Sequence, residues 1–124
     1  MRLAWIVDDD EEMRHAIKLM LEMMDFRVGL FGDARSASKG LLAGNHPDVI
    51  ILDIMMPEVS GIDMLEFMRR RSDMKGIPVV MLSSETTDVQ VDEAMALGAN
   101  AFVFKPVTFD ELEAAIHKAI SHHA

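Results

Sequence analysis

Apolar runs of strand length recur along the chain. Five such runs occur, at residues 3–7, 26–31, 49–52, 77–82 and 101–104. The third run and most of the fourth are continuously apolar, which is typical of strands covered by helices on both faces of a sheet. The second run alternates more between apolar and polar residues and contains a glycine, so we expect it at an edge of the sheet.

Apolar positions with helical spacing fill the intervals between these runs. The first interval contains a stripe of Met13, Ala16, Ile17, Met20 and Met24. The last interval contains a stripe of Leu112, Ala115, Ile116, Ala119 and Ile120. A shorter stripe at Ile62, Leu65 and Met68 marks the middle helix, and segments 34–44 and 86–98 are rich in Ala and Leu. The sequence therefore predicts five helices, one after each strand.

Strand and helix alternate five times, with no linker or low-complexity segment between them. Such alternation predicts a doubly wound α/β fold, in which helices cover both faces of a five-stranded parallel sheet. The length fits a single domain, so we expect residues 1–124 to form one unit. Ligands of such folds bind beyond the carboxyl ends of the strands, near the point where the strand order reverses.

Polar residues that follow the strands define the candidate site. Those at the carboxyl ends of four strands are Asp8, Asp9 and Asp10, then Asp53, then Ser83 and Ser84, and finally Lys105 before Pro106. No comparable group follows the second strand, where the sequence GDARS indicates a turn and a helix start. Carboxylates, hydroxyls and one ammonium are therefore expected to converge at one edge of the sheet.

The acidic run 8–12 divides into two parts. Residues 10–12 are expected in the first helical turn, where carboxylates accept hydrogen bonds from free N–H groups and are favoured by the helix dipole. Asp8 and Asp9 end the strand and would form, with Asp53, a cage of oxygen ligands. Mg²⁺ is a hard cation that binds a few carboxylates and keeps several waters, so this cage predicts a magnesium site.

Charge and composition exclude or disfavour several kinds of partner and site. The chain carries 21 acidic and 12 basic residues, a formal net charge of −9, which disfavours direct binding of nucleic acid by this domain. It contains no cysteine, so disulfides and thiolate metal sites are excluded. No apolar run approaches the ~20 residues of a transmembrane helix, and the N-terminus lacks the pattern of a signal peptide. We therefore expect a cytoplasmic protein that does not bind a membrane.

Four segments together resemble one known family. They are IVDD at 6–9, LDIMMPEVSG at 52–61, VVMLSSE at 79–85 and GANAFVFKP at 98–106. In this order they are similar to the receiver domain of bacterial two-component response regulators, of the chemotaxis-regulator type, and the match covers essentially the whole chain. The resemblance implies the flavodoxin-like strand order 2-1-3-4-5.

The resemblance also implies a chemistry. Asp53 would be the phosphorylated nucleophile, and Lys105, joined to Pro106 by a cis peptide bond, would pair with the carboxylate and then with the phosphoryl group. Mg²⁺ would be bound by Asp8, Asp9, Asp53 and the backbone carbonyl of Met55. A carboxylate is a weak nucleophile toward phosphorus, and the two cations would neutralise the charge that repels it.

The resemblance also implies roles for two further pairs of residues. Ser83 would be the switch hydroxyl, which bonds a new phosphoryl oxygen and vacates space into which the aromatic Phe102 can rotate. A simple core position is the alternative for Phe102. Met55 and Glu85, each two residues beyond a site residue, would flank the path of the hydrolytic water, with Met55 slowing the loss of phosphate.

The implied function is a signalling module and not an enzyme, apart from self-phosphorylation and self-dephosphorylation of Asp53. Phosphate would come from a histidine kinase or a histidine phosphotransfer protein. The signal would pass to a downstream protein or a fused output domain through the surface of the fourth helix, fifth strand and fifth helix.

Two other functions compete with this interpretation. The first is a phosphate-independent pseudo-receiver that acts only as an interaction surface. The second is a haloacid-dehalogenase-type phosphatase, whose Asp-x-Asp-x-Thr/Val motif would begin at Asp8. That function is disfavoured because Glu12 stands in the last place of the motif.

Overall fold

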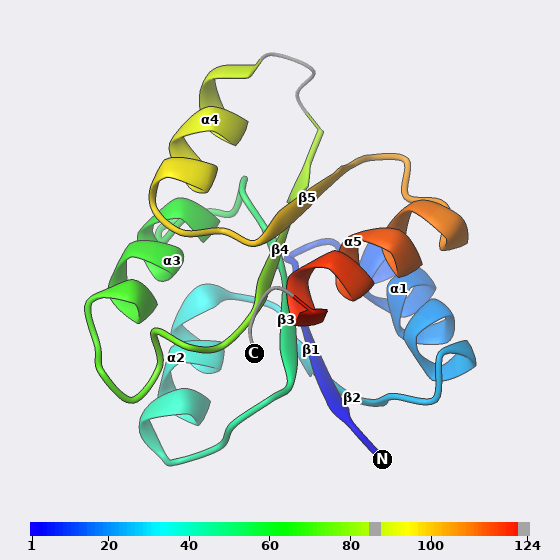
Figure 1. Cartoon of the computed structure of the whole chain (residues 1–124), viewed down its shortest axis with the longest axis horizontal. Coiled ribbons are helices and arrows are strands. Elements are labelled where there is room, and N and C mark those ends of the chain that lie inside the picture. The colour runs from blue at the N-terminus through cyan, green and yellow to red at the C-terminus, as the bar shows by residue number, and fades with distance from the viewer. Residues whose placement is uncertain (85–87, 122–124) are drawn as a thin grey trace.

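The computed structural model describes residues 1–84 and 88–121, and its centre is one five-stranded parallel sheet (Figure 1). The strand order is β2-β1-β3-β4-β5, which confirms the order implied by the resemblance. Every neighbouring pair of strands is parallel. The strands are β1 (Leu3–Val7), β2 (Arg27–Phe31), β3 (Val49–Asp53), β4 (Val79–Ser83) and β5 (Ala101–Phe104).

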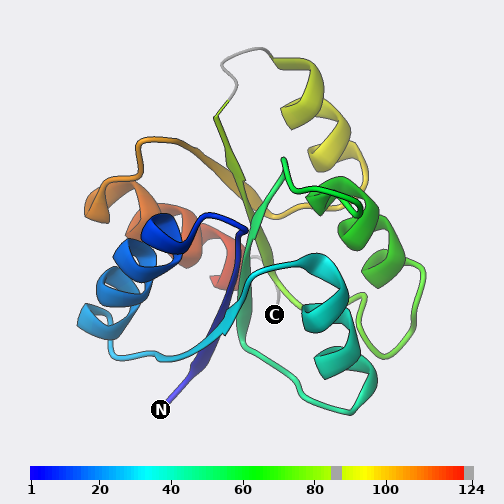
Figure 2. The same ribbon diagram turned by 180° about the vertical axis from the view of Figure 1, so that it is seen from behind.

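Helices cover both faces of this sheet, as Figure 2 shows from behind. They are α1 (Glu11–Met23), α2 (Ala34–Leu42), α3 (Gly61–Arg69), α4 (Asp88–Ala96) and α5 (Phe109–Ser121). α1 and α5 pack on one face, and α2, α3 and α4 pack on the other. The doubly wound α/β fold is therefore confirmed. Among the described residues, no helix combines the length and the hydropathy that crossing a bilayer requires.

Alternate residues of the strands supply the two halves of the core. In β1, Ala4 and Ile6 pack with α1 and α5, whereas Trp5 and Val7 pack with the helices of the opposite face. β3 and β4 are buried along their whole length, as their continuous apolar sequences predict. β2 is partly exposed and lies at an edge, which confirms the prediction for the run that contains glycine.

The strand boundaries differ slightly from the apolar runs. β3 ends on Asp53 and β4 ends on Ser83, one residue beyond each run, so both polar side chains belong to the sheet. β4 begins after Pro78 because proline has no N–H group to donate to a neighbouring strand. β2 begins one residue later than its run because the N–H of Phe26 donates to the carbonyl of Leu21 at the end of α1.

The start of α1 confirms the prediction for residues 10–12. Asp10 is the N-cap, and its side chain accepts hydrogen bonds from the backbone N–H groups of Glu12 at 3.0 Å and Met13 at 3.2 Å. Glu11 and Glu12 lie in the first turn, where negative charge is favoured. The three residues therefore serve the helix, which leaves Asp8 and Asp9 for the site.

The single tryptophan of the chain is held between two glycines. Trp5 is 4% exposed, and its ring centroid lies 4.5 Å from that of Phe31. A Cβ atom added to Gly29 of β2 would lie 2.7 Å from Cδ1 of the indole, and one added to Gly40 of α2 would lie 2.9 Å from Cη2. Both glycines therefore make room for the indole between β2 and α2.

We expect Gly29→Ala to lower the free energy of unfolding by roughly 1–3 kcal/mol, because the new methyl group would displace the Trp5 ring in a closely packed core. Urea unfolding followed by the fluorescence of the one tryptophan measures the change. Gly76→Ala is the control, because a Cβ atom there meets nothing within 4 Å. Equal stability of the two variants would contradict the packing argument.

Candidate functional site

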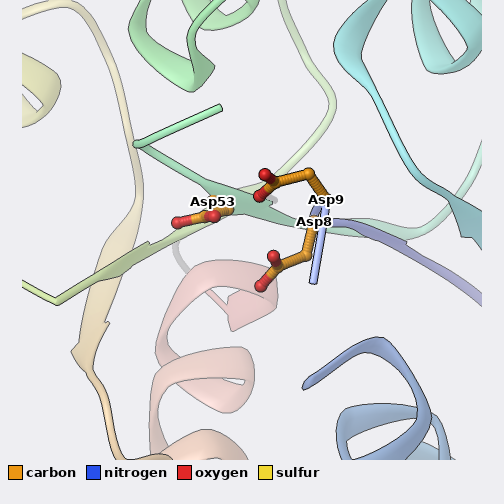
Figure 3. A group of neighbouring side chains, drawn as sticks. All are labelled: Asp8, Asp9 and Asp53. Atoms are coloured by element: carbon orange, nitrogen blue, oxygen red, sulfur yellow. The ribbon is translucent and has the colours of Figure 1, made fainter. Parts of the chain in front are cut away.

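Three carboxylates meet at the carboxyl edge of the sheet, where Figure 3 shows them together. The parallel register sets Val7 of β1 beside Leu52 of β3, so the residues that follow them, Asp8 and Asp53, are neighbours. Asp8, Asp9 and Asp53 each offer an oxygen, and these oxygens lie within 4.8 Å of one another. Asp8 is fully buried and Asp53 is 3% exposed, whereas Asp9 is exposed.

Local hydrogen bonds fix the position of Asp8. Its backbone N–H donates to the carbonyl of Phe31 at 3.1 Å, and its carboxylate accepts from the N–H of Asp10 at 2.9 Å. The guanidinium of Arg14 donates to the carbonyl of Asp8 at 2.7 Å. The turn between β1 and α1 is therefore held from both the neighbouring strand and the helix that follows.

Asp53 is held by the close approach of α3. The N–H of Gly61, the first residue of α3, donates to the carbonyl of Ile54 at 2.9 Å. A Cβ atom at Gly61 would lie only 2.1 Å from the carbonyl oxygen of Asp53, so no other residue fits there without moving the site. The N–H of Met55 points at the carboxylate of Asp53, at 3.4 Å from Oδ1.

One ammonium group bridges two of the carboxylates. Nζ of Lys105 lies 3.2 Å from Oδ2 of Asp8 and 3.4 Å from Oδ1 of Asp53, and the lysine side chain is 19% exposed. The backbone N–H of Lys105 donates to the carbonyl of Ser83 at 2.8 Å, and the bond from Lys105 to Pro106 is cis. Ser83 itself is buried at the end of β4.

Burial and repulsion perturb this site. Burial, together with the neighbouring charge of Asp8, raises the pKa of Asp53 to about 7, although the nearby Lys105 ammonium opposes that change. Burial by itself would lower the pKa of Lys105, but the carboxylates of Asp53 and Asp8 outweigh it and raise that pKa. One ammonium therefore pairs with two buried carboxyl groups, and the third, Asp9, lies beside them. The oxygen donor set and the remaining negative charge fit a hard divalent cation such as Mg²⁺.

The other predicted residues lie around this centre. Phe102 is 39% exposed, with its ring edge against Phe104 at 5.2 Å, so a simple core position is wrong for it. Met55 is 52% exposed, and its Sδ accepts a hydrogen bond from Nε2 of Gln90 at 3.6 Å. Glu85 lies outside the described residues. The roles of Phe102, Met55 and Glu85 stay predictions.

Sequence reasoning missed three contributors to the site. Gly61 belongs to the motif LDIMMPEVSG, and its place four residues beyond Pro57, at a helix start, is the feature that could have indicated its role. Nothing in the sequence indicates a role in the site for Arg14 or Gln90, because a polar residue on a helix is usually a solvated side chain. Their contacts, to the Asp8 carbonyl and to Met55, depend on how the helices pack.

Comparison with known proteins gives one consistent answer. The family model for the response regulator receiver domain matches residues 4–117. The chain is 34% identical over 113 residues to the chemotaxis protein CheY of Pseudomonas aeruginosa, covering 91% of each. It is 33% identical over 115 residues to the regulatory protein AtoC of Escherichia coli, covering 93% of this chain but only 24% of AtoC.

A solved structure agrees with these sequence matches. The chemotaxis response regulator CheY4 of Vibrio cholerae superimposes with a TM-score of 0.87 at 28% identity, and the match covers 96% of this chain and 98% of that one.

In the absence of divalent cations, we expect Asp53→Asn to stabilise the fold, and more so at higher pH. The pKa of Asp53 in the folded state is above its ordinary value of 3.8, so ionisation of this one group lowers the unfolding free energy of the wild type as the pH rises from about 4 to about 7. An amide does not titrate, so the difference in unfolding free energy should grow over that range to roughly 1–3 kcal/mol and then level off.

Urea unfolding in EDTA at several pH values between 4 and 8 measures this difference. Asp92→Asn, which removes one carboxylate from an exposed position on α4, is the control for a general change of net charge. A difference for Asp53→Asn that does not depend on pH, or that follows the control, would contradict the expectation.

Proposed function

The chain belongs to the response regulator receiver domain family, and on that premise we propose that it accepts a phosphoryl group on Asp53 from a histidine kinase or a histidine phosphotransfer protein. Receiver domains are signalling modules of two-component systems, and a phosphoacceptor role is general to the family. The observation that carries the proposal is the Lys105 ammonium between the buried carboxylates of Asp8 and Asp53.

The chain's own residues would perform the transfer as follows. An oxygen of Asp53 forms a bond to phosphorus while the bond from phosphorus to the donor's histidine nitrogen breaks, leaving its electron pair on that nitrogen. Lys105 then exchanges its contact with the Asp53 carboxylate for one with a phosphoryl oxygen, where its positive charge offsets the new negative charge. Phosphoryl transfer depends mainly on positioning and on such electrostatic stabilisation.

Magnesium is the proposed cofactor. The carboxylates of Asp8, Asp9 and Asp53, with the backbone carbonyl of Met55, would hold it. When bound, it would neutralise charge on the phosphoryl oxygens. The proposal is supported by the hard oxygen donors and by the excess of negative charge at this edge.

The proposed output follows from Ser83 and Phe102. The Ser83 hydroxyl would bond a phosphoryl oxygen and so favour one of two arrangements of the surface formed by α4, β5 and α5. The partial exposure of Phe102 on β5 leaves it able to rotate inward in that second arrangement. A downstream protein or a fused output domain would respond to that change.

The proposal also covers the domain organisation, the partners and the location of the protein. The chain spans about a quarter of the length of AtoC, so a longer protein with an output domain is one setting for it. A net charge of −9 supports the expectation that this domain does not itself bind nucleic acid. A cytoplasmic location and a single domain over residues 1–124 complete the proposal.

We expect one acid-labile phosphorylation site. Incubation with a small phosphodonor and Mg²⁺ should add ~80 Da to the intact protein, the mass of one phosphoryl group on a nucleophilic carboxylate. Mass spectrometry of Asp53→Asn should show no such addition. The matched control is Asp92→Asn, an exposed carboxylate on α4, which should be modified like the wild type. Failure of the wild type to react would favour the pseudo-receiver, and full modification of Asp53→Asn would move the site elsewhere.

Binding of Mg²⁺ should depend on Asp9, because its exposed carboxylate faces the two buried ones without being needed for the core. We expect Asp9→Ala to weaken binding at least ~10-fold, because loss of even a residue that only orients a metal ligand typically costs that much affinity. Calorimetric titration measures the affinity, with Glu11→Ala as the control for an acidic residue of the first turn of α1. Equal affinities of Asp9→Ala and wild type would exclude Asp9 from the site.

A further inference from the structure

A side chain of α4 contacts the loop that follows the phosphoacceptor strand. Nε2 of Gln90, in the first turn of α4, donates to Sδ of Met55 at 3.6 Å, across 35 positions of sequence. A thioether sulfur is a weak acceptor, yet this hydrogen bond joins α4 to the residue two positions beyond Asp53. This hydrogen bond is therefore a direct link between α4 and the loop beside Asp53.

Fold stability does not explain the choice of glutamine at position 90. Oε1 of Gln90 is buried and has no hydrogen-bond partner within the described part of the chain. A buried acceptor without a partner is destabilising, and the donor of the same amide is used on a weak acceptor. The amide therefore points to a role other than stability.

The path of the Met55 side chain indicates that role. Its backbone N–H lies against Oδ1 of Asp53, and its side chain reaches α4. The register pairs Asp53 with Leu82 near the end of β4, and α4 follows β4. In Figures 1 and 2 the connection from β3 to α3 rises beside the end of β4, toward α4. The Met55 side chain therefore starts beside the Asp53 carboxylate and ends at α4.

We propose that Gln90 is a positioning residue that holds Met55 over the approach to Asp53 and so prolongs the life of the phosphoryl group. The inference rests on the proposed function. In hydrolysis, a water oxygen bonds to phosphorus, the bond from phosphorus to the Asp53 oxygen breaks, and its electron pair stays on the carboxylate. The water's proton passes to the released phosphate or to solvent. This water must approach in line with the breaking bond, and in this proposal Met55 covers that approach from the side of α4.

The link makes the lifetime depend on α4. When the N-terminal turn of α4 moves away from the loop, the amide leaves the sulfur and Met55 is free to rotate off the carboxylate. A partner that binds α4 in its present position would then slow hydrolysis, and one that displaces the turn would accelerate it. Lifetime and helix position are thereby coupled through one hydrogen bond.

The decay of the phosphorylated full chain at constant Mg²⁺ tests the proposal in a double-mutant cycle. The species compared are wild type, Gln90→Ala, Met55→Ala and the double variant. We expect Gln90→Ala to lose phosphate roughly two- to five-fold faster than wild type, the effect of one weak hydrogen bond. In the Met55→Ala background the same change at position 90 should have no effect, because the side chain it positions is gone.

Two control variants separate positioning from general disturbance of α4. Gln90→Met keeps the length of the side chain but has no donor, and it should decay like Gln90→Ala. Val89→Ala, at the exposed neighbouring position on the same helix, should decay like wild type. Thermal unfolding of all variants should differ little, since Gln90 is not expected to stabilise the fold.

The outcomes distinguish this inference from the proposed function. Normal phosphorylation with a wild-type decay rate in Gln90→Ala would overturn the role of Gln90 and leave the function intact. A faster decay in Gln90→Ala that persists fully in the Met55→Ala background would also overturn it, because the effect would not pass through Met55. No phosphorylation of the wild type would overturn both.

Discussion

The ion pairs of Lys105 with Asp8 and Asp53 are the central interaction of the site. Two buried carboxylates side by side repel each other, and burial already disfavours their charged forms. One ammonium lowers that repulsion without removing it, so the pKa of Asp53 stays raised, to about 7. The site therefore carries more negative than positive charge. A bound divalent cation would reduce that imbalance, and a transferred phosphoryl group would increase it.

Such an arrangement persists only on a rigid support. The sheet supplies it, because parallel strands of fixed register end at one edge, and Asp53 and Ser83 are themselves the last residues of their strands. Two contacts then tighten the support. Gly61 lets α3 approach the Asp53 backbone more closely than any side chain would allow, and Arg14 binds the carbonyl of Asp8 from α1. The stability of the core therefore offsets the unfavourable electrostatics of the site.

α4 is attached differently at its two ends. Beyond its carboxyl end, the carbonyl of Gly98 accepts from the guanidinium of Arg69 at 2.9 Å, and the same guanidinium reaches the carbonyl of Ile77 and the side chain of Asn100. Its amino end, by contrast, reaches the site through the weak contact of Gln90 with sulfur. Charge-assisted hydrogen bonds thus anchor the end far from Asp53, whereas the near end contacts the loop, within the described residues, through a weak sulfur acceptor.

The elements, the fold class and the polar groups at the strand ends were all predictable from the amino-acid sequence. They were predictable because hydrophobic periodicity is local, and because a parallel sheet brings all carboxyl ends to one edge. Three facts came from the folded chain alone: Asp8 is buried while Asp9 is exposed, Lys105 reaches both Asp8 and Asp53, and Gln90 contacts Met55. Those facts depend on side-chain rotamers and on how each helix is seated against the sheet. Both are set by packing between residues distant in sequence, which no local pattern encodes.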